Sequence, residues 1–160
     1  MKNPNAINLK AKVDVSKFIF KAKSTLQELA RDVYLEIGYR IVYRSPVGDP
    51  RKWRPPRWPK GYVPGHFINN WQVGIDQVPV GIIGAVDPMG AGSYARLQKL
   101  GRWQIGHTYY FVNNLPYAKA LEEGHSLQSP PGGMVELTRR EFPQIVKDIQ
   151  ARYAANKFGV

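Results

Sequence analysis

Residues 14–43 read DVSKFIFKAKSTLQELARDVYLEIGYRIVY, and this stretch decides the fold class. Apolar side chains recur along it at steps of three or four residues, at Phe18, Ala22, Leu26, Leu29, Val33, Ile37 and Ile41. That period is typical of one face of an α-helix, with Asp14 as the expected N-cap and Pro46 as the residue that stops it. At 1.5 Å per residue the helix is about 43 Å long, so we expect it to overhang a small domain and to turn part of its apolar face to another subunit.

The next segment, residues 45–66, reads SPVGDPRKWRPPRWPKGYVPGH and holds six prolines, three glycines and five basic residues. Neither a helix nor a central strand tolerates this density of proline, because proline lacks the main-chain N–H group and has a fixed φ angle. The sequence therefore predicts an extended loop. A loop of this length inside a small domain is usually functional or bound to a partner.

Three runs rich in strand-forming residues follow, at Phe67–Ile75, Gln77–Val86 and Thr108–Asn113. Pro79 predicts an edge position for the second run, because proline cannot donate a ladder hydrogen bond. Between the second and third runs, Ser93 is expected to cap a short helix that continues to Leu100 and ends at Gly101.

The C-terminal part of the chain predicts one more long helix. Thr138 and Glu141 have the spacing of a capping box, which would begin a helix that runs to about Ala154 with Pro143 inside it. Met134–Leu137 is predicted as a brief strand before it. The element order is typical of an α+β fold, in which the long N-terminal helix and the C-terminal helix pack on a small, mostly antiparallel β-sheet.

The composition is that of one folded domain over residues 1–160, with residues 1–12 as a flexible arm. The chain has 160 residues, of which 43% are hydrophobic and 12% aromatic, and this is enough for an ordinary core. It has no cysteine, which excludes disulfides, thiolate metal sites and cysteine nucleophiles. No apolar run approaches the length of a membrane span, and no secretory signal follows the first lysine, so we expect a soluble protein with no membrane contact.

The formal net charge is +11, and the first 60 residues carry most of it, with fourteen Lys and Arg against five acidic residues. A basic region indicates an acidic partner such as nucleic acid or an acidic protein face. The proline-rich loop concentrates the charge beside two indoles, at Arg51, Trp53, Arg54, Arg57 and Trp58. Arginine and tryptophan bind phosphates and unpaired bases, but they also dominate protein interfaces. We favour protein contact and keep contact with DNA as the alternative.

The sequence gives little support to an enzyme. Its histidines are His66, His107 and His125, and only His125 has acidic neighbours, in the sequence EEGH. Metal sites place two or more ligands at helical or C-x2-C-like spacing, and no such pair is present. We interpret His125 as a helix-end or interface residue, and we expect no catalytic residue, no metal and no cofactor.

Residues 112–135, VNNLPYAKALEEGHSLQSPPGGMV, are the most informative stretch for function. A strand runs into a short helix that Pro116 starts and Gly124 ends, and a Pro-Pro-Gly-Gly loop follows. We interpret the stretch as a rigid corner that presents Glu122, Glu123 and His125 at a surface, with a well-capped structural turn as the alternative. Tyr117, on the apolar face of the short helix, is a candidate interface residue together with Glu122 and His125.

This chain resembles the tail-completion, or neck, proteins of tailed bacteriophages, the family typified by the minor tail-completion protein of lambda-like phages. The resemblance covers roughly residues 25–150, with the motifs in matching order. These are the long helix followed by Ser45-Pro46-Val47-Gly48-Asp49-Pro50, then Asn70-Trp71-Gln72, and then Asn114-Leu115-Pro116-Tyr117-Ala118, Leu121-Glu122, Gly124-His125-Ser126, Gln128 and Pro131-Gly132-Gly133-Met134.

The resemblance implies a structural virion protein without catalysis, assembled in the host cytoplasm as a ring, a hexamer or a higher ring. The ring would lie in the neck, between the head connector or adaptor and the tail tube or tail terminator, with non-specific contact to genomic DNA in the channel as a further expectation. We hypothesise that Trp53, Trp58 and the arginines around them dock onto a neighbouring subunit or an adjoining ring. The alternative from another class is a small basic DNA-binding protein that uses the first third of the chain.

Overall fold

The computed structural model describes residues 15–55, 60–102 and 104–158. The expected flexible arm at residues 1–12 and the expected cap Asp14 lie outside the described residues, as do Arg57 and Trp58 of the loop.

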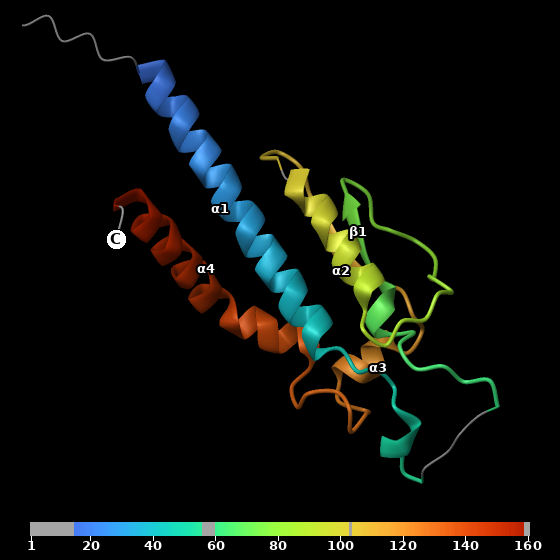
Figure 1. Cartoon of the computed structure of the whole chain (residues 1–160). Coiled ribbons are helices and arrows are strands. Elements are labelled where there is room, and N and C mark those ends of the chain that lie inside the picture. Colours follow the sequence, from blue (N-terminus) through green and yellow to red (C-terminus); the bar gives the residue numbers. More distant parts are fainter. Residues whose placement is uncertain (1–14, 56–59, 103, 159–160) are drawn as a thin grey trace, which may run out of the picture.

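The architecture is the α+β arrangement that the sequence predicts, with two long helices and a small antiparallel sheet. Helix α1 lies in the middle, α4 runs along one side of it, and α2 and the sheet lie on its other side (Figure 1). The elements in chain order are α1 (Val15–Arg44), the 3-10 turns η1 (Pro50–Lys52) and η2 (Ile68–Asn70), β1 (Trp71–Ile75), α2 (Ala91–Leu97), the 3-10 turn η3 (Gln98–Arg102), β2 (Tyr109–Asn113), α3 (Ala118–Glu122) and α4 (Met134–Phe158).

Helix α1 confirms the 30-residue periodic pattern and ends one residue before Ser45, as Pro46 predicts. Its N-terminal part overhangs the domain: all five residues 22–26 are exposed, and Leu26 of the apolar stripe keeps 57% of its surface. Further along, Val33 is buried against Ile145 and Ile149 of α4, which forms a small core between the two helices.

The main core surrounds Trp71, the first residue of β1. Its indole ring stacks on Phe111 of β2 with ring centroids 4.9 Å apart, and its Nε1 donates a buried hydrogen bond to Ser45 Oγ at 2.8 Å. The Ser45 hydroxyl in turn donates to the carbonyl of Ile41 at 2.8 Å. Ser45, the residue that follows α1, therefore links the sheet to the helix.

The two strands form one antiparallel pair, in which Trp71 lies opposite Asn113 and Ile75 opposite Tyr109. The expected third strand, Gln77–Val86, is wrong: these residues are an extended segment that pairs with no strand. Pro79 cannot donate to a ladder, and Gly81 has a φ of 84°, which breaks the strand geometry. Side-chain amides of other segments bind the carbonyls of this segment instead.

Two of the expected helix caps are also wrong. Ser93 lies inside α2, where its buried hydroxyl accepts from the N–H of Trp71 at 3.2 Å. Asp87 takes the capping role, because its carboxylate accepts from the main-chain N–H groups of Met89 and Ala91 at 2.9 and 2.7 Å. Aspartate before a glycine turn is a normal helix start, but it lies six residues upstream of the serine that the sequence favours.

At the C-terminal helix, the expected brief strand Met134–Leu137 is wrong, since α4 already begins at Met134 and includes Pro143. Thr138 is an interior residue whose hydroxyl donates to the carbonyl of Met134 at 2.8 Å. The capping box is replaced by a distant acid: Glu122, the last residue of α3, accepts from the N–H groups of Met134, Val135 and Glu136. Gly124 follows the end of short helix α3 by two residues, and its φ of 84° confirms the predicted glycine stop.

Candidate partner-binding pocket

The proline-rich loop and α3 enclose a cavity of about 270 Å³ that opens to the surface. We call it the Trp53 pocket. Its walls are mainly aromatic, and its side chains come from the loop, from the turn before β1, from α3 and from the turn after it: Trp53, Tyr62, His66, Phe67, Tyr117 and Gln128. Aromatic walls with a few polar groups are typical of sites that bind another molecule.

Hydrogen bonds of Asp49 fix the first part of the loop. Asp49 caps η1 by accepting from the N–H of Arg51 at 3.0 Å. The Asp49 main chain also makes two hydrogen bonds to the Gln128 side chain: its N–H donates to Gln128 Oε1 at 2.7 Å, and its carbonyl accepts from Gln128 Nε2 at 3.0 Å. Because a side-chain amide satisfies both main-chain groups, this end of the loop is fixed to the turn after α3 without a β-ladder.

Trp53 forms one wall of the pocket. Its ring packs edge-on against Tyr62 with centroids 5.0 Å apart, and its main-chain N–H donates to the carbonyl of Pro50 at 3.2 Å. The Tyr62 hydroxyl donates to the carbonyl of Gly48 at 2.9 Å, and burial raises the pKa of Tyr62. Gly48 has a φ of 82°, and a Cβ there would lie 2.4 Å from the Tyr62 hydroxyl oxygen, so glycine is needed at this position.

His66 and Tyr117 close the other side. The ring Nε2 of His66 donates to the carbonyl of Ile83 at 2.9 Å, and Tyr117 donates its hydroxyl to Nδ1 at 3.4 Å. Tyr117 also packs on Phe67 with centroids 6.2 Å apart and keeps 43% of its surface exposed. Burial raises the pKa of Tyr117. Both nitrogens of His66 are used in holding the wall, so the histidine has a structural part in this pocket.

The structure brings Trp53 and Tyr117 of the predicted site together in one pocket and places the others elsewhere. Arg51 is exposed and ion-paired with Asp49 at 2.7 Å, which holds the pKa of Asp49 at about 2. Arg54 is exposed on the outer part of the loop. The remaining loop positions of the predicted site, Arg57 and Trp58, lie outside the described residues.

Two predicted residues of the corner differ in their surroundings. His125 is exposed, as expected, and its main-chain N–H donates to the carbonyl of Ala120 at 2.9 Å. The expectation that Glu122 is presented to a partner is corrected, because its carboxylate turns inward to the first turn of α4. Glu123 is exposed and forms an ion pair with Lys119 at 3.7 Å.

Several arginines are neutralised within the chain. Arg40 and Arg44 both bind Glu141 at 2.7 Å, which lowers the pKa of Glu141. Glu136 binds two arginines of its own helix, Arg139 and Arg140, and these hold the pKa of Glu136 at about 2. The net charge is unchanged by this pairing, but these guanidinium groups already have carboxylate partners.

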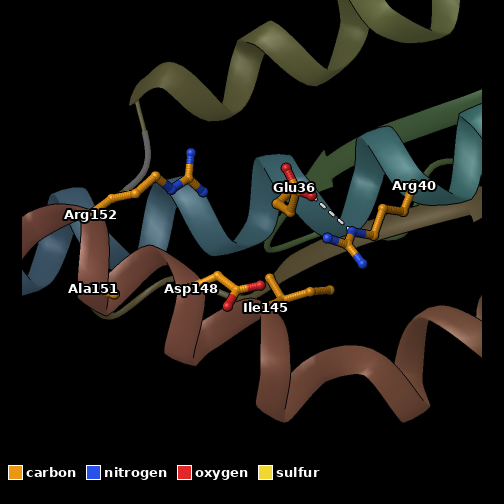
Figure 2. Close-up of a pocket in the computed structure, with 6 residues that line it drawn as sticks. All are labelled: Glu36, Arg40, Ile145, Asp148, Ala151 and Arg152. Carbon is orange, nitrogen blue, oxygen red and sulfur yellow. Dashed lines mark hydrogen bonds and ion pairs between the residues drawn. The ribbon is translucent and has the colours of Figure 1, made fainter.

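A second cavity, of about 380 Å³, lies between α1 and α4. Figure 2 shows Glu36 and Arg40 projecting toward each other from α1, across from Asp148 and Arg152 of α4. The ion pair between Arg40 and Glu36 measures 2.8 Å. Since the lining carries both signs of charge, the cavity has no evident preference for a ligand, and we assign none to it.

No group of three His, Cys, Asp or Glu side chains in the described part of the chain could hold a metal ion. Among the described residues, no helix combines the length and the apolar character needed to cross a membrane.

Sequence reasoning missed Tyr62, His66 and Gln128 as parts of the pocket. Tyr62 stands in the same aromatic, proline-rich run as Trp53, and this run was a usable signal. His66 and Gln128 are held in the pocket by contacts across 51 and 79 residues of chain, to Tyr117 and Asp49, which no local pattern reveals.

Comparison of the chain with protein-family models, with curated proteins and with solved structures found no match.

Proposed function

We propose that this chain is a structural virion protein that forms a ring in the neck of a tailed bacteriophage and joins the head connector to the tail. The proposal starts from the sequence resemblance described above. In it the subunit is assembled in the host cytoplasm, is retained in the virion and carries out no chemistry.

The observation that carries the proposal is the amount of apolar surface that the single chain leaves open. Val80 is 88% exposed and Met89 77% exposed, on the segment that follows β1. Tyr43 is 84% exposed at the end of α1, and Leu127 is 73% exposed beside the Trp53 pocket. Apolar surface gathered on several sides supports a subunit that is covered by neighbours on more than one face.

The Trp53 pocket is, in this proposal, the contact with an adjoining ring. Trp53 is fixed edge-on to Tyr62, so it acts as a preformed wall into which a partner side chain inserts. A preformed pocket lowers the entropy cost of association, because its side chains are already ordered before the partner arrives. This refines the hypothesis drawn from the sequence, in which Trp53, Trp58 and the arginines around them dock onto a neighbouring subunit or an adjoining ring.

Replacement of both loop tryptophans tests the pocket. A phage that encodes Trp53→Ala with Trp58→Ala should produce heads and tails that do not join, while the purified variant keeps the circular dichroism spectrum and the cooperative unfolding of the wild type. Phe142→Ala, which removes an exposed aromatic ring of α4 outside the pocket, is the matched control and should leave joining intact. A normal yield of joined particles from the double variant would contradict the role of the pocket.

The second candidate, a small basic DNA-binding protein, rests on the exposed cations of the loop, among them Lys52, Arg54 and Lys60. A binder that makes about six phosphate contacts should lose about 10³-fold in affinity between 50 and 200 mM salt. A ring subunit should bind DNA weakly at most and without sequence preference. Arg40, Arg44 and Arg51 already pair with carboxylates of the chain. To bind DNA they would have to give up these carboxylates for phosphates, so the pairing favours the ring over the DNA-binding protein.

A further inference from the structure

The segment at residues 77–86 has the sequence of a strand, QVPVGIIGAV, but finds no strand to pair with in its own chain. Alternate carbonyls of the segment accept hydrogen bonds from side-chain amides of neighbouring segments. The donors are Asn114 to Pro79 at 2.8 Å, Gln72 to Gly81 at 3.0 Å, Asn70 to Ile83 at 2.7 Å and Asn69 to Ala85 at 3.1 Å. One edge of the segment is therefore held by a row of amides in place of a β-ladder.

The intervening residues have no such partners. No main-chain group of Val78, Val80, Ile82, Gly84 or Val86 is hydrogen-bonded to another described residue. The exposed fraction is 51% for Val78, 88% for Val80, 50% for Ile82 and 41% for Val86. An open edge of unpaired N–H and C=O groups lined by valine and isoleucine is a template for pairing with another chain.

The same chain carries a second open edge, on β2. The N–H of Asp76 donates to the carbonyl of Thr108 at 2.8 Å, so residues 76 and 108 form a hydrogen-bonded pair. Because such pairs alternate along an antiparallel ladder, the main-chain groups of Phe111 face away from β1. Within the described residues no strand lies on that side.

An apolar recess adjoins this edge. It has a volume of about 210 Å³ and lies between α1, the end of α2 and β2, with Ile37, Ile41, Leu97, Leu100 and Phe111 among its walls. Its mouth includes Tyr34, which is 40% exposed. Valine and isoleucine side chains suit such a recess, because the lining offers few polar groups that would have to be desolvated.

A single copy cannot join these two edges. The segment lies across the face of the sheet that carries Gly74, where a Cβ would lie 2.1 Å from the Gln77 carbonyl oxygen and 2.6 Å from the Pro79 ring. The recess lies on the opposite face, which carries Phe111 stacked on Trp71. The segment and the recess are therefore on opposite faces of one two-stranded sheet.

We propose that residues 78–86 of one copy add as a third strand to the outer edge of β2 in the next copy, with Gly81 forming a bulge in that strand and Val80 and Ile82 entering the apolar recess. The inference rests on the proposed function, which supplies the second copy as the occupant. Because the two surfaces differ, the contact is head-to-tail, and repetition of such a contact closes a ring when the rotation permits.

The apolar area of the segment is a substantial part of what an interface needs. Val78, Val80, Ile82 and Val86 together expose on the order of 350 Å² of surface, which is the size at which apolar patches mark interaction sites. A stable interface buries about 800 Å² from each partner, so the segment would supply a little under half of one side.

Cross-linking between two single-cysteine variants tests the contact directly, because the natural chain has no cysteine. Val80→Cys protein is mixed with Tyr34→Cys protein and treated with a short bismaleimide, and the mass of the products is measured. We expect a Val80–Tyr34 cross-linked pair that neither variant forms alone. Val80 is 88% exposed, whereas Tyr34 is 40% exposed and its ring packs on Tyr109 with centroids 5.8 Å apart, so circular dichroism of the Tyr34→Cys protein checks that its fold is intact.

Each other outcome is informative. A cross-linked dimer from Val80→Cys alone would mean that the segment pairs with its own copy across a two-fold axis, which overturns the proposal. Rings seen by native mass spectrometry without the mixed cross-link would overturn this contact and leave the ring standing. If the protein remains monomeric, does not cross-link and is absent from virions, both the contact and the proposed function fail.

A charge substitution gives an independent readout. Val80→Lys with Ile82→Lys should weaken self-association by at least about tenfold, because two ammonium groups would have to enter an apolar recess. Val63→Lys, at a position 51% exposed on the proline-rich loop, is the matched control and should leave self-association unchanged. Equal effects of the two variants would overturn the contact.

Discussion

Glu122 and Met134 are joined by a hydrogen bond of 2.9 Å, in which the carboxylate that ends α3 accepts from the first N–H group of α4. The same carboxylate also accepts from the next two main-chain N–H groups, at 3.1 and 2.9 Å. These groups have no partner within the helix, and the helix dipole places positive potential on them. One acidic side chain therefore fixes the angle between the corner and the C-terminal helix.

We predict that Glu122→Ala lowers the free energy of unfolding by about 1–2 kcal/mol, the usual cost of losing a helix cap. The neighbouring substitution Glu123→Ala removes only an exposed ion pair with Lys119, and it should change the free energy by less than about 0.5 kcal/mol. Urea denaturation of both variants measures the difference. Equal stabilities for the two would show that the cap does not contribute.

Gly38 of α1 lies directly against Leu97 of α2. A Cβ there would lie 2.3 Å from a methyl group of Leu97, which is fully buried. Alanine normally favours a helix over glycine by about 1 kcal/mol, but here we expect the overlap to prevail and Gly38→Ala to destabilise by about 1–3 kcal/mol. Gly84→Ala, where nothing lies within 4 Å, is the control. A stabilised Gly38→Ala protein in thermal unfolding would contradict this packing.

The buried hydrogen bond between Trp71 and Ser45 should be worth more than a surface hydrogen bond. Ser45→Ala leaves the indole N–H of Trp71 without its acceptor in the core, at an expected cost of about 1–3 kcal/mol. Trp71→Phe removes the donor together with part of the ring. A double-mutant cycle of the two substitutions should give a coupling energy above about 0.5 kcal/mol. Additive effects would mean that the hydrogen bond does not contribute to stability.

The alkaline stability should depend on Tyr153. Burial, and then the hydrogen bond that its hydroxyl donates to Asp32 at 2.8 Å, raise the pKa of Tyr153 to about 12. In the unfolded chain a tyrosine ionises near pH 10, so the fold gains stability from this group below about pH 10 and loses it as the pH rises to about 12.

The free energy of unfolding, measured between pH 9 and 12, should accordingly fall more steeply for the wild type than for Tyr153→Phe. Tyr43→Phe, which removes an exposed hydroxyl, is the control for the loss of one tyrosine. If Tyr153→Phe has the same pH dependence as the wild type, the tyrosine does not hold its proton in the folded state as described.

The sequence predicts the helices well and the connections poorly, for physical reasons. The stripe from Leu26 to Ile41 identifies α1, and Pro46 identifies its end, because both signals are local. The capping role of Glu122 was not foreseen, since it acts on residues twelve positions away, and the nearer Thr138–Glu141 spacing matched a known motif. The helix therefore begins at Met134, where the distant Glu122 caps it, and not at the local Thr138–Glu141 motif.

The segment at residues 77–86 is a failure of a different kind. Its composition favours a strand, but a strand needs a partner edge, and here the side-chain amides of Asn70 and Gln72 bind the carbonyls of Ile83 and Gly81 in place of a β-ladder. For the candidate site, sequence located Trp53 and Tyr117 but gave no indication that they share one pocket. That arrangement depends on Asp49 binding Gln128 across 79 residues of chain.

The measurement that tests the central claim most directly is electron microscopy of purified phage particles in which this chain carries a gold-labelled C-terminal tag. The account predicts gold at the junction between head and tail of every complete particle, and separate heads and tails when the gene is deleted. Particles that are joined normally without the chain, or label that remains in the lysate as a free 18.1 kDa monomer, would contradict it.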